Sequence, residues 1–151
     1  MKNFFKEKNR VSLLNRLSNL TNEHTSRWGK MNSHQVIVHL TDPFRAALNE
    51  RPVAVHRSAF SKWPFNKFVV YIMPWPKGAP TAPEFIQGVK GSTPVEFEKD
   101  KQELFRAMEK FVLSEKTMTF LPSPVFGKIN NKDWGRLMWR HVNHHLKQFG
   151  V

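Results

Sequence analysis

The 151-residue chain contains no cysteine, and this absence excludes three classes of site at once. A disulfide scaffold, a thiolate metal site and a catalytic cysteine nucleophile all need a sulfur that the sequence does not have. Long apolar runs are missing as well: the longest, residues 68–73, is far short of the roughly 18 residues that cross a membrane. The segment Met1–Lys8 has no secretory apolar region. We therefore expect one soluble, cytoplasmic domain over residues 1–151.

Acidic residues are scarce, with 12 Asp and Glu against 24 Lys and Arg, so the net charge is +12. Such a surplus is typical of proteins that bind nucleic acids or anionic surfaces. The sequence has no dense block of basic residues, however, and no basic stripe at helical spacing, which favours a solvated basic surface. We predict no specific nucleic-acid partner and no membrane partner. Attraction of a small anionic substrate stays open.

Four segments have the apolar periodicity of amphipathic helices. Seven of the ten prolines lie between Pro52 and Pro94 and make the connection between the second and third helices long. Within that connection, residues 58–73 fit either a short helix or a buried extended run, and residues 74–83 fit a loop. The sequence therefore predicts an all-α fold, a four-helix bundle with a long connection between helices two and three. Three of the predicted helices cover residues 10–20, 32–49 and 131–149, and the third in chain order begins at residue 93.

The starts of the predicted helices carry capping residues. Two of them combine an N-cap Asn with a polar residue three positions later, which is the arrangement of a capping box. The third is predicted to have Thr93 as its N-cap and Pro94 at its first position, and Gly150 is predicted to end the fourth. The two Asn pairs are Asn32 with Gln35 and Asn130 with Asp133.

The last predicted helix carries two histidines in the middle of its apolar stripe. At about 100° per residue, His141 and His145 fall within this stripe, whereas His144 lies at its edge. Two histidines four residues apart on one inward face are placed to bind one metal ion. The alternative is a pair of hydrogen-bonded core residues, but this helix offers no carboxylate beyond Asp133. We predict metal binding by His141 and His145.

A third metal ligand has to come from another segment. The candidates are His24, His34, His39 and His56. His39 lies on the shoulder of the apolar stripe of the second helix. Pro43 cannot donate a hydrogen bond to the carbonyl of His39, and a kink or bulge there would turn His39 toward the interior. Pro43 is therefore expected to interrupt this helix.

The His39-Leu-Thr-Asp42 motif, combined with His141-x-x-His144-His145-x-x-Gln148, resembles the DinB/YfiT-like family of metal-binding four-helix bundles. The Trp28-Gly-Lys-Met-Asn segment before the second helix resembles one branch of that family whose function is uncharacterised. The resemblance implies that His39, His141 and His145 bind one divalent metal ion, commonly zinc or nickel. It also implies thiol S-transferase or isomerase chemistry, which several members of that family perform.

Three imidazoles with an open fourth position are typical of a catalytic metal site. Asp42 is the candidate catalytic residue, because it could orient an imidazole or take a proton; the alternative is a surface acid paired with Arg45. His144 could donate a hydrogen bond to a metal ligand, but we interpret it as a solvated helix residue. Arg45, Arg136 and Arg140 could hold an anionic group, although solvation is the stronger expectation for each.

The function predicted from these residues is that of a divalent-metal-dependent enzyme, a thiol S-transferase or a hydrolase. Its substrate would be a small molecule that is anionic or supplies a thiol, because the chain has no thiol of its own. Two alternatives stay open: a metal-stabilised binding module without catalysis, and a basic nucleic-acid-binding protein. A homodimer is compatible with each of them.

Overall fold

A computed structural model describes residues 1–51, 53–55, 59–78, 81–87 and 89–151. Apart from two isolated β-bridges, the described residues form helices and no β-strand, so the predicted all-α class is confirmed. None of the described helices combines the length and the apolar character that a membrane crossing needs. The α-helices are α1 (Glu7–Ser18), α2 (Ser33–Ala47), α3 (Phe65–Tyr71), α4 (Phe97–Leu113) and α5 (Asn131–Phe149), and two short 3-10 helices are η1 (Ala59–Ser61) and η2 (Pro83–Phe85).

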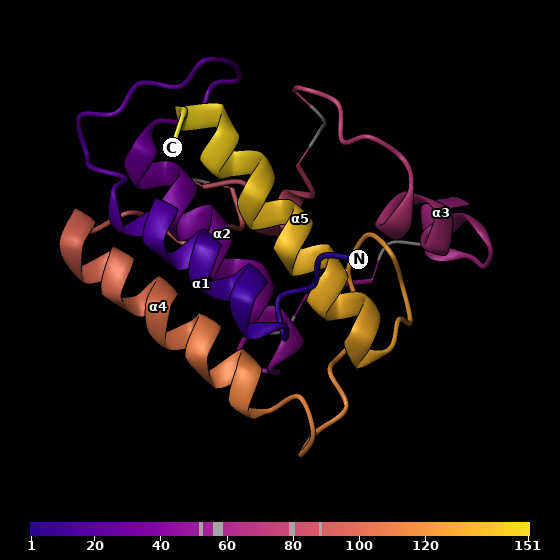
Figure 1. Cartoon of the computed structure of the whole chain (residues 1–151). Coiled ribbons are helices and arrows are strands. Elements are labelled where there is room, and N and C mark those ends of the chain that lie inside the picture. The colour runs from indigo at the N-terminus through magenta and orange to yellow at the C-terminus, as the bar shows by residue number, and fades with distance from the viewer. Residues whose placement is uncertain (52, 56–58, 79–80, 88) are drawn as a thin grey trace.

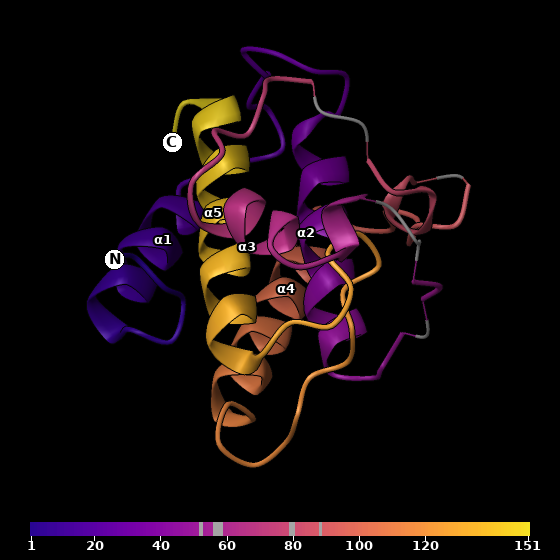
Figure 2. The ribbon, with the colours of Figure 1, turned by 90° about the vertical axis from the view of Figure 1, so that its right-hand side faces the viewer.

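The four long helices lie side by side, and the short α3 stands to one side of them (Figure 1). α2 packs against both α4 and α5, and α1 packs against α5. The view of Figure 2 shows α3 lying across the side of α5, with which it is in contact. Because α2 and α5 are direct neighbours, side chains on their facing sides can meet between them.

Apolar side chains from all four long helices fill the core. An aromatic cluster lies where the N-terminal segment meets α2 and α4: the ring centroid of Phe44 is 5.3 Å from that of Phe4 and 5.2 Å from that of Phe111. Phe111 also stacks on Phe120 at 4.5 Å. Such pairs contribute about 0.5–1.5 kcal/mol each beyond the area that they bury. This cluster fixes α2, whose buried residues include His39.

The predicted capping boxes are confirmed at α2 and α5. The side chains of Asn32 and Asn130 each accept a hydrogen bond from the backbone N–H three residues later, and the side chain at that position accepts one from the N-cap N–H. Gly150 ends α5 in the left-handed conformation with φ 78°, as predicted. The predicted interruption at Pro43 is wrong, because α2 continues through it. Tight packing along most of α2 offsets the one hydrogen bond that proline removes.

The predicted start of the third long helix is also wrong. α4 begins at Phe97, and Glu96 rather than Thr93 is its N-cap. The carboxylate of Glu96 accepts from the N–H groups of Glu98 and Lys99, so it satisfies the donors that an N-cap Thr would have satisfied. Of the two alternatives predicted for residues 58–73, a short helix or an extended run, the short helix is confirmed. This helix is α3, and the 3-10 helix η1 precedes it.

Candidate metal centre

Three histidines from two helices meet between α2 and α5. The Nε2 atom of His39 lies 3.0 Å from Nε2 of His141, which in turn lies 3.1 Å from Nε2 of His145. One ligand atom from each of the three lies within 4.8 Å of the others. His39 and His145 are buried, and His141 is partly exposed. The structure thus brings together the three residues that the sequence predicted as metal ligands.

A backbone carbonyl fixes the ring of His39. Its Nδ1 atom lies 3.2 Å from the carbonyl oxygen of Phe85, at the end of η2. A carbonyl oxygen can only accept a hydrogen bond, so Nδ1 of His39 carries the proton and donates it. The other ring nitrogen, Nε2, therefore presents a lone pair toward His141.

The ring of His145 is fixed by Gln148, one turn further along α5. The Nε2 amide of Gln148 donates to the carbonyl of Trp28 over 2.6 Å, which sets the orientation of the side-chain amide. Its Oε1 atom then faces Nδ1 of His145 at 2.7 Å and accepts that proton. The Nε2 atom of His145 also presents a lone pair toward His141.

Gly29 makes this approach of Gln148 to the backbone feasible. It has φ 82°, in the left-handed region that favours glycine, and a Cβ atom at this position would lie 2.6 Å from Nε2 of Gln148. The Trp28-Gly29 backbone therefore belongs to the support of His145.

All three imidazoles are held neutral. Burial lowers the pKa of His145 from 6.5 to about 3, and the nearby His39 adds to the effect. Burial also lowers the pKa of His141 well below 6.5, with further lowering by His145 and His39. The pKa of His39 is lowered by burial, which outweighs its hydrogen bond to Phe85. The neutral imidazole is the form that binds metal ions.

The donor set fits a cation. His39 and His145 each direct a lone pair at Nε2 of His141. If that nitrogen carries a proton, its single N–H can donate a full hydrogen bond to only one of the two. A divalent ion would satisfy all three nitrogens at once, and imidazole suits zinc and nickel alike. Among the residues described, no fourth His, Asp or Glu belongs to the group.

Asp42 is fully buried, and its carboxylate is bound by a serine and an arginine. Its carboxylate accepts from the N–H and the hydroxyl of Ser92, at 2.9 and 2.6 Å, and from Arg51 at 3.2 Å. Arg51 in turn donates to the carbonyls of Glu84 and Lys90. Asp42 thereby anchors the segment that presents the Phe85 carbonyl to His39. Its catalytic role stays a prediction.

The other histidine candidates lie apart from the cluster. His34 pairs with Asp100 at 2.7 Å, and His24 bonds to Thr21. His56 lies outside the described residues. His144 is partly exposed, so its solvation stays a prediction, and its ring lies 6.0 Å from those of both Trp28 and Trp75.

The arginines considered in the sequence are bound to protein groups. Arg45 pairs with Glu103 at 2.9 Å, so the alternative of an Asp42–Arg45 pair is wrong. Arg136 donates to the carbonyls of Lys2 and Tyr71. Arg140 donates to the last carbonyls of α3 and stabilises the end of that helix.

Sequence reasoning missed the groups that orient the imidazoles. Phe85 acts through its backbone carbonyl, and because every residue has one, the residue type does not indicate this role. Gln148 had a signal: it follows His145 by three residues, a spacing that brings two side chains together on a helix. Arg51 lies beyond the end of α2, and no periodicity links it to Asp42.

Comparison with curated proteins and with solved structures finds no match. A family described as "Protein of unknown function (DUF1569)" matches residues 5–150. The match takes in the five α-helices of the described residues and the three clustered histidines. The chain therefore belongs to the DUF1569 family.

Proposed function

We propose that the protein is a divalent-metal-dependent enzyme whose metal is held by His39, His141 and His145. The observation that carries the proposal is the pair of Nε2 lone pairs, fixed by Phe85 and Gln148, that converge on His141. The proposal includes zinc or nickel as the ion and a four-helix bundle of the DinB/YfiT-like kind. The side-by-side arrangement of the four long helices supports the bundle (Figure 1).

A divalent ion held by three neutral imidazoles supplies a Lewis acid that lowers the pKa of a water or a thiol toward neutrality. The chain's own part is to hold each imidazole neutral and pointed at one place. Because the sequence has no cysteine, a thiol would have to arrive with the substrate. We therefore propose thiol S-transfer or hydrolysis on a small molecule, with Asp42 positioning the segment that carries the Phe85 carbonyl.

Metal analysis of the purified protein tests the proposal. After equilibration with zinc or nickel and removal of free ion, the wild-type chain should retain one ion, and His141→Ala and His145→Ala should retain little. His24→Ala is the matched control, since His24 bonds to Thr21 outside the cluster. Full retention in both cluster variants would refute the site. Metal without turnover on thiol-transfer and ester substrates would favour the binding module.

A further inference from the structure

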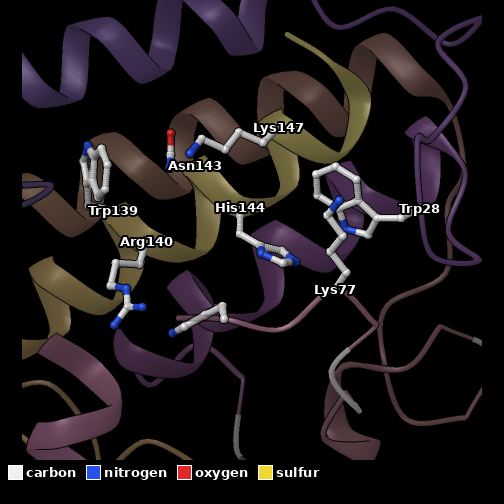
Figure 3. Close-up of a pocket in the computed structure, with 8 residues that line it drawn as sticks. Trp28, Lys77, Trp139, Arg140, Asn143, His144 and Lys147 are labelled. Atoms are coloured by element: carbon white, nitrogen blue, oxygen red, sulfur yellow. The ribbon is translucent and has the colours of Figure 1, made fainter. Parts of the chain in front are cut away.

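A pocket opens on the side of α5 next to the histidine cluster. Its volume is about 280 Å³, at the small end of the range for ligand sites, which suits a molecule of one or two rings. His144 stands in the middle of the lining, with Trp28 and Lys77 on one side and Trp139 and Arg140 on the other (Figure 3).

All the charged side chains that line this pocket are positive. Lys77, Arg140 and Lys147 contribute cations, and no acidic residue of the described chain lines the pocket. Lys77 and Lys147 form no ion pair with a described carboxylate. The guanidinium of Arg140 donates its hydrogen bonds to backbone carbonyls, which are neutral. Among the described residues, these three positive charges therefore have no anionic partner.

The aromatic rings are interleaved with these cations. The Nζ of Lys77 lies 4.8 Å from the ring centroid of Trp28, and the guanidinium of Arg140 lies 5.6 Å from that of Trp75. The lining therefore offers ring faces and positive charge side by side, and a ligand that carries both a flat ring and a negative charge matches it.

Two hydrogen-bond donors in this lining have no partner. The indole Nε1 atoms of Trp28 and Trp75 are both buried and lack an acceptor in the described structure. Buried donors are normally paired, and an unpaired one costs free energy. Trp28 and Trp75 both line the pocket, so an anion bound there would lie beside two rings whose N–H groups still need an acceptor.

The pocket also shares its wall with the histidine cluster. The ring of Trp75 lies 5.5 Å from that of His141, and the ring of His144 lies 5.2 Å from that of His145. The carbonyl of Trp28 holds Gln148, which orients His145. A ligand against these rings would be one residue layer from the predicted metal.

We propose that this pocket binds a small organic anion that carries a flat ring, such as an aryl carboxylate or an aryl phosphate. The identification of this anion as the substrate rests on the proposed function. The binding itself rests only on the cations, the rings and the two unpaired indole N–H groups.

Calorimetric titration with benzoate, phenyl phosphate, benzamide and acetate tests the proposal. The two ring-bearing anions should bind, with an affinity that falls as salt is raised. Benzamide lacks the charge and acetate lacks the ring, so each should bind about 10- to 100-fold more weakly than benzoate. Equal affinity for benzoate and benzamide would overturn the proposal, and so would displacement of benzoate by a tighter-binding single-stranded oligonucleotide.

Charge-matched variants localise the site. Lys77→Gln combined with Lys147→Gln should weaken benzoate binding by about tenfold. The control combines Lys116→Gln with Lys128→Gln, two exposed lysines outside the pocket lining, with the same change in net charge. Equal weakening in both variants would show that only the overall charge attracts the anion, and would overturn the proposal.

Two conservative variants test the indole donors. Trp28→Phe and Trp75→Phe keep a ring and remove the N–H, so each should weaken benzoate about five- to tenfold and weaken benzamide, whose carbonyl is a neutral acceptor, by less. Since neither N–H has a partner among the described residues, neither variant loses a hydrogen bond within that part of the chain that would lower the unfolding temperature. Unchanged benzoate affinity in both variants would remove the donors from the proposal and refute it as stated.

Titrating the protein before and after chelation separates this inference from the proposed function. Benzoate binding by a chain that fails to retain added zinc or nickel would refute the metal-dependent function and leave the pocket standing. Metal retention without benzoate binding would refute the pocket and leave the metal site standing.

Discussion

Gln148 provides the sharpest test of how the metal centre is built, because its side chain makes two hydrogen bonds with different consequences. It accepts from His145 at 2.7 Å and donates to the Trp28 carbonyl at 2.6 Å. Gln148→Leu removes both bonds, whereas Gln148→Glu keeps an acceptor for His145 and removes only the donor. The pair of variants therefore separates support of the imidazole from support of the Trp28 loop.

The expected magnitude follows from these two bonds. Loss of an outer partner of a metal-binding histidine costs about 10- to 100-fold in affinity, or about 1.4–2.7 kcal/mol. Gln148→Leu should lose this amount for zinc, because nothing then fixes Nδ1 of His145 as the protonated nitrogen. Gln148→Glu should bind zinc at least as tightly as the wild type, since a carboxylate is a stronger acceptor than an amide.

Competition between the protein and a chromophoric zinc chelator at pH 7.5 measures both variants on one scale. Thermal unfolding of the metal-free chains serves as the control for folding, because both variants lose the bond to Trp28. The reasoning is refuted if Gln148→Leu binds zinc as tightly as the wild type. It is also refuted if Gln148→Glu is weakened as much as Gln148→Leu.

Three further predictions concern two buried polar contacts and one glycine. Asp42→Asn should lower the free energy of unfolding by about 2–3 kcal/mol, because it leaves the charge of Arg51 without its buried partner. Denaturant titration measures this change, and a value near zero would contradict the prediction. Burial and the hydrogen bond to Asp133 raise the pKa of Tyr71 to about 12, and Tyr71 is the chain's one tyrosine, so tyrosinate absorbance should stay low until the pH is well above 10. The neutral phenol then favours the folded state fully below pH 10 and progressively less above it; a midpoint near 10 in the folded chain, as expected in denaturant, would contradict the burial. Gly29→Ala should weaken zinc binding in the same assay, since the added Cβ displaces Gln148, and unaltered affinity would show that Gln148 has room to shift.

The sequence predicted the parts of this structure that local chemistry decides. The Asn32 and Asn130 capping boxes and the Gly150 stop depend on residues within one turn, and each was placed correctly. The predicted start of the third helix was wrong because Glu96, which is not a favoured N-cap residue, caps α4 with its carboxylate, while Asp100 accepts from the N–H groups of Val95 and Glu96. Pro43 failed for a related reason, since packing along α2 outweighs its missing N–H.

The candidate site divides in the same way. His141 and His145 share an apolar helix face, so periodicity alone brought them together. His39 lies on another helix, and mainly the resemblance to a known family joined it to them. The Phe85 carbonyl and the Arg51–Asp42 contact depend on the path of residues 84–92, which carries no periodic pattern. Long-range geometry of this kind is absent from a single sequence.

His39 and His141 are 102 positions apart in the chain, yet their Nε2 atoms lie 3.0 Å from each other. An ion held by both would be a reversible crosslink between α2 and α5, in a protein that has no cysteine with which to form a permanent one. Its contribution to stability would follow mass action, about 2.7 kcal/mol when free ion exceeds the dissociation constant 100-fold. The resistance of this fold to unfolding would then vary with the free metal concentration around it.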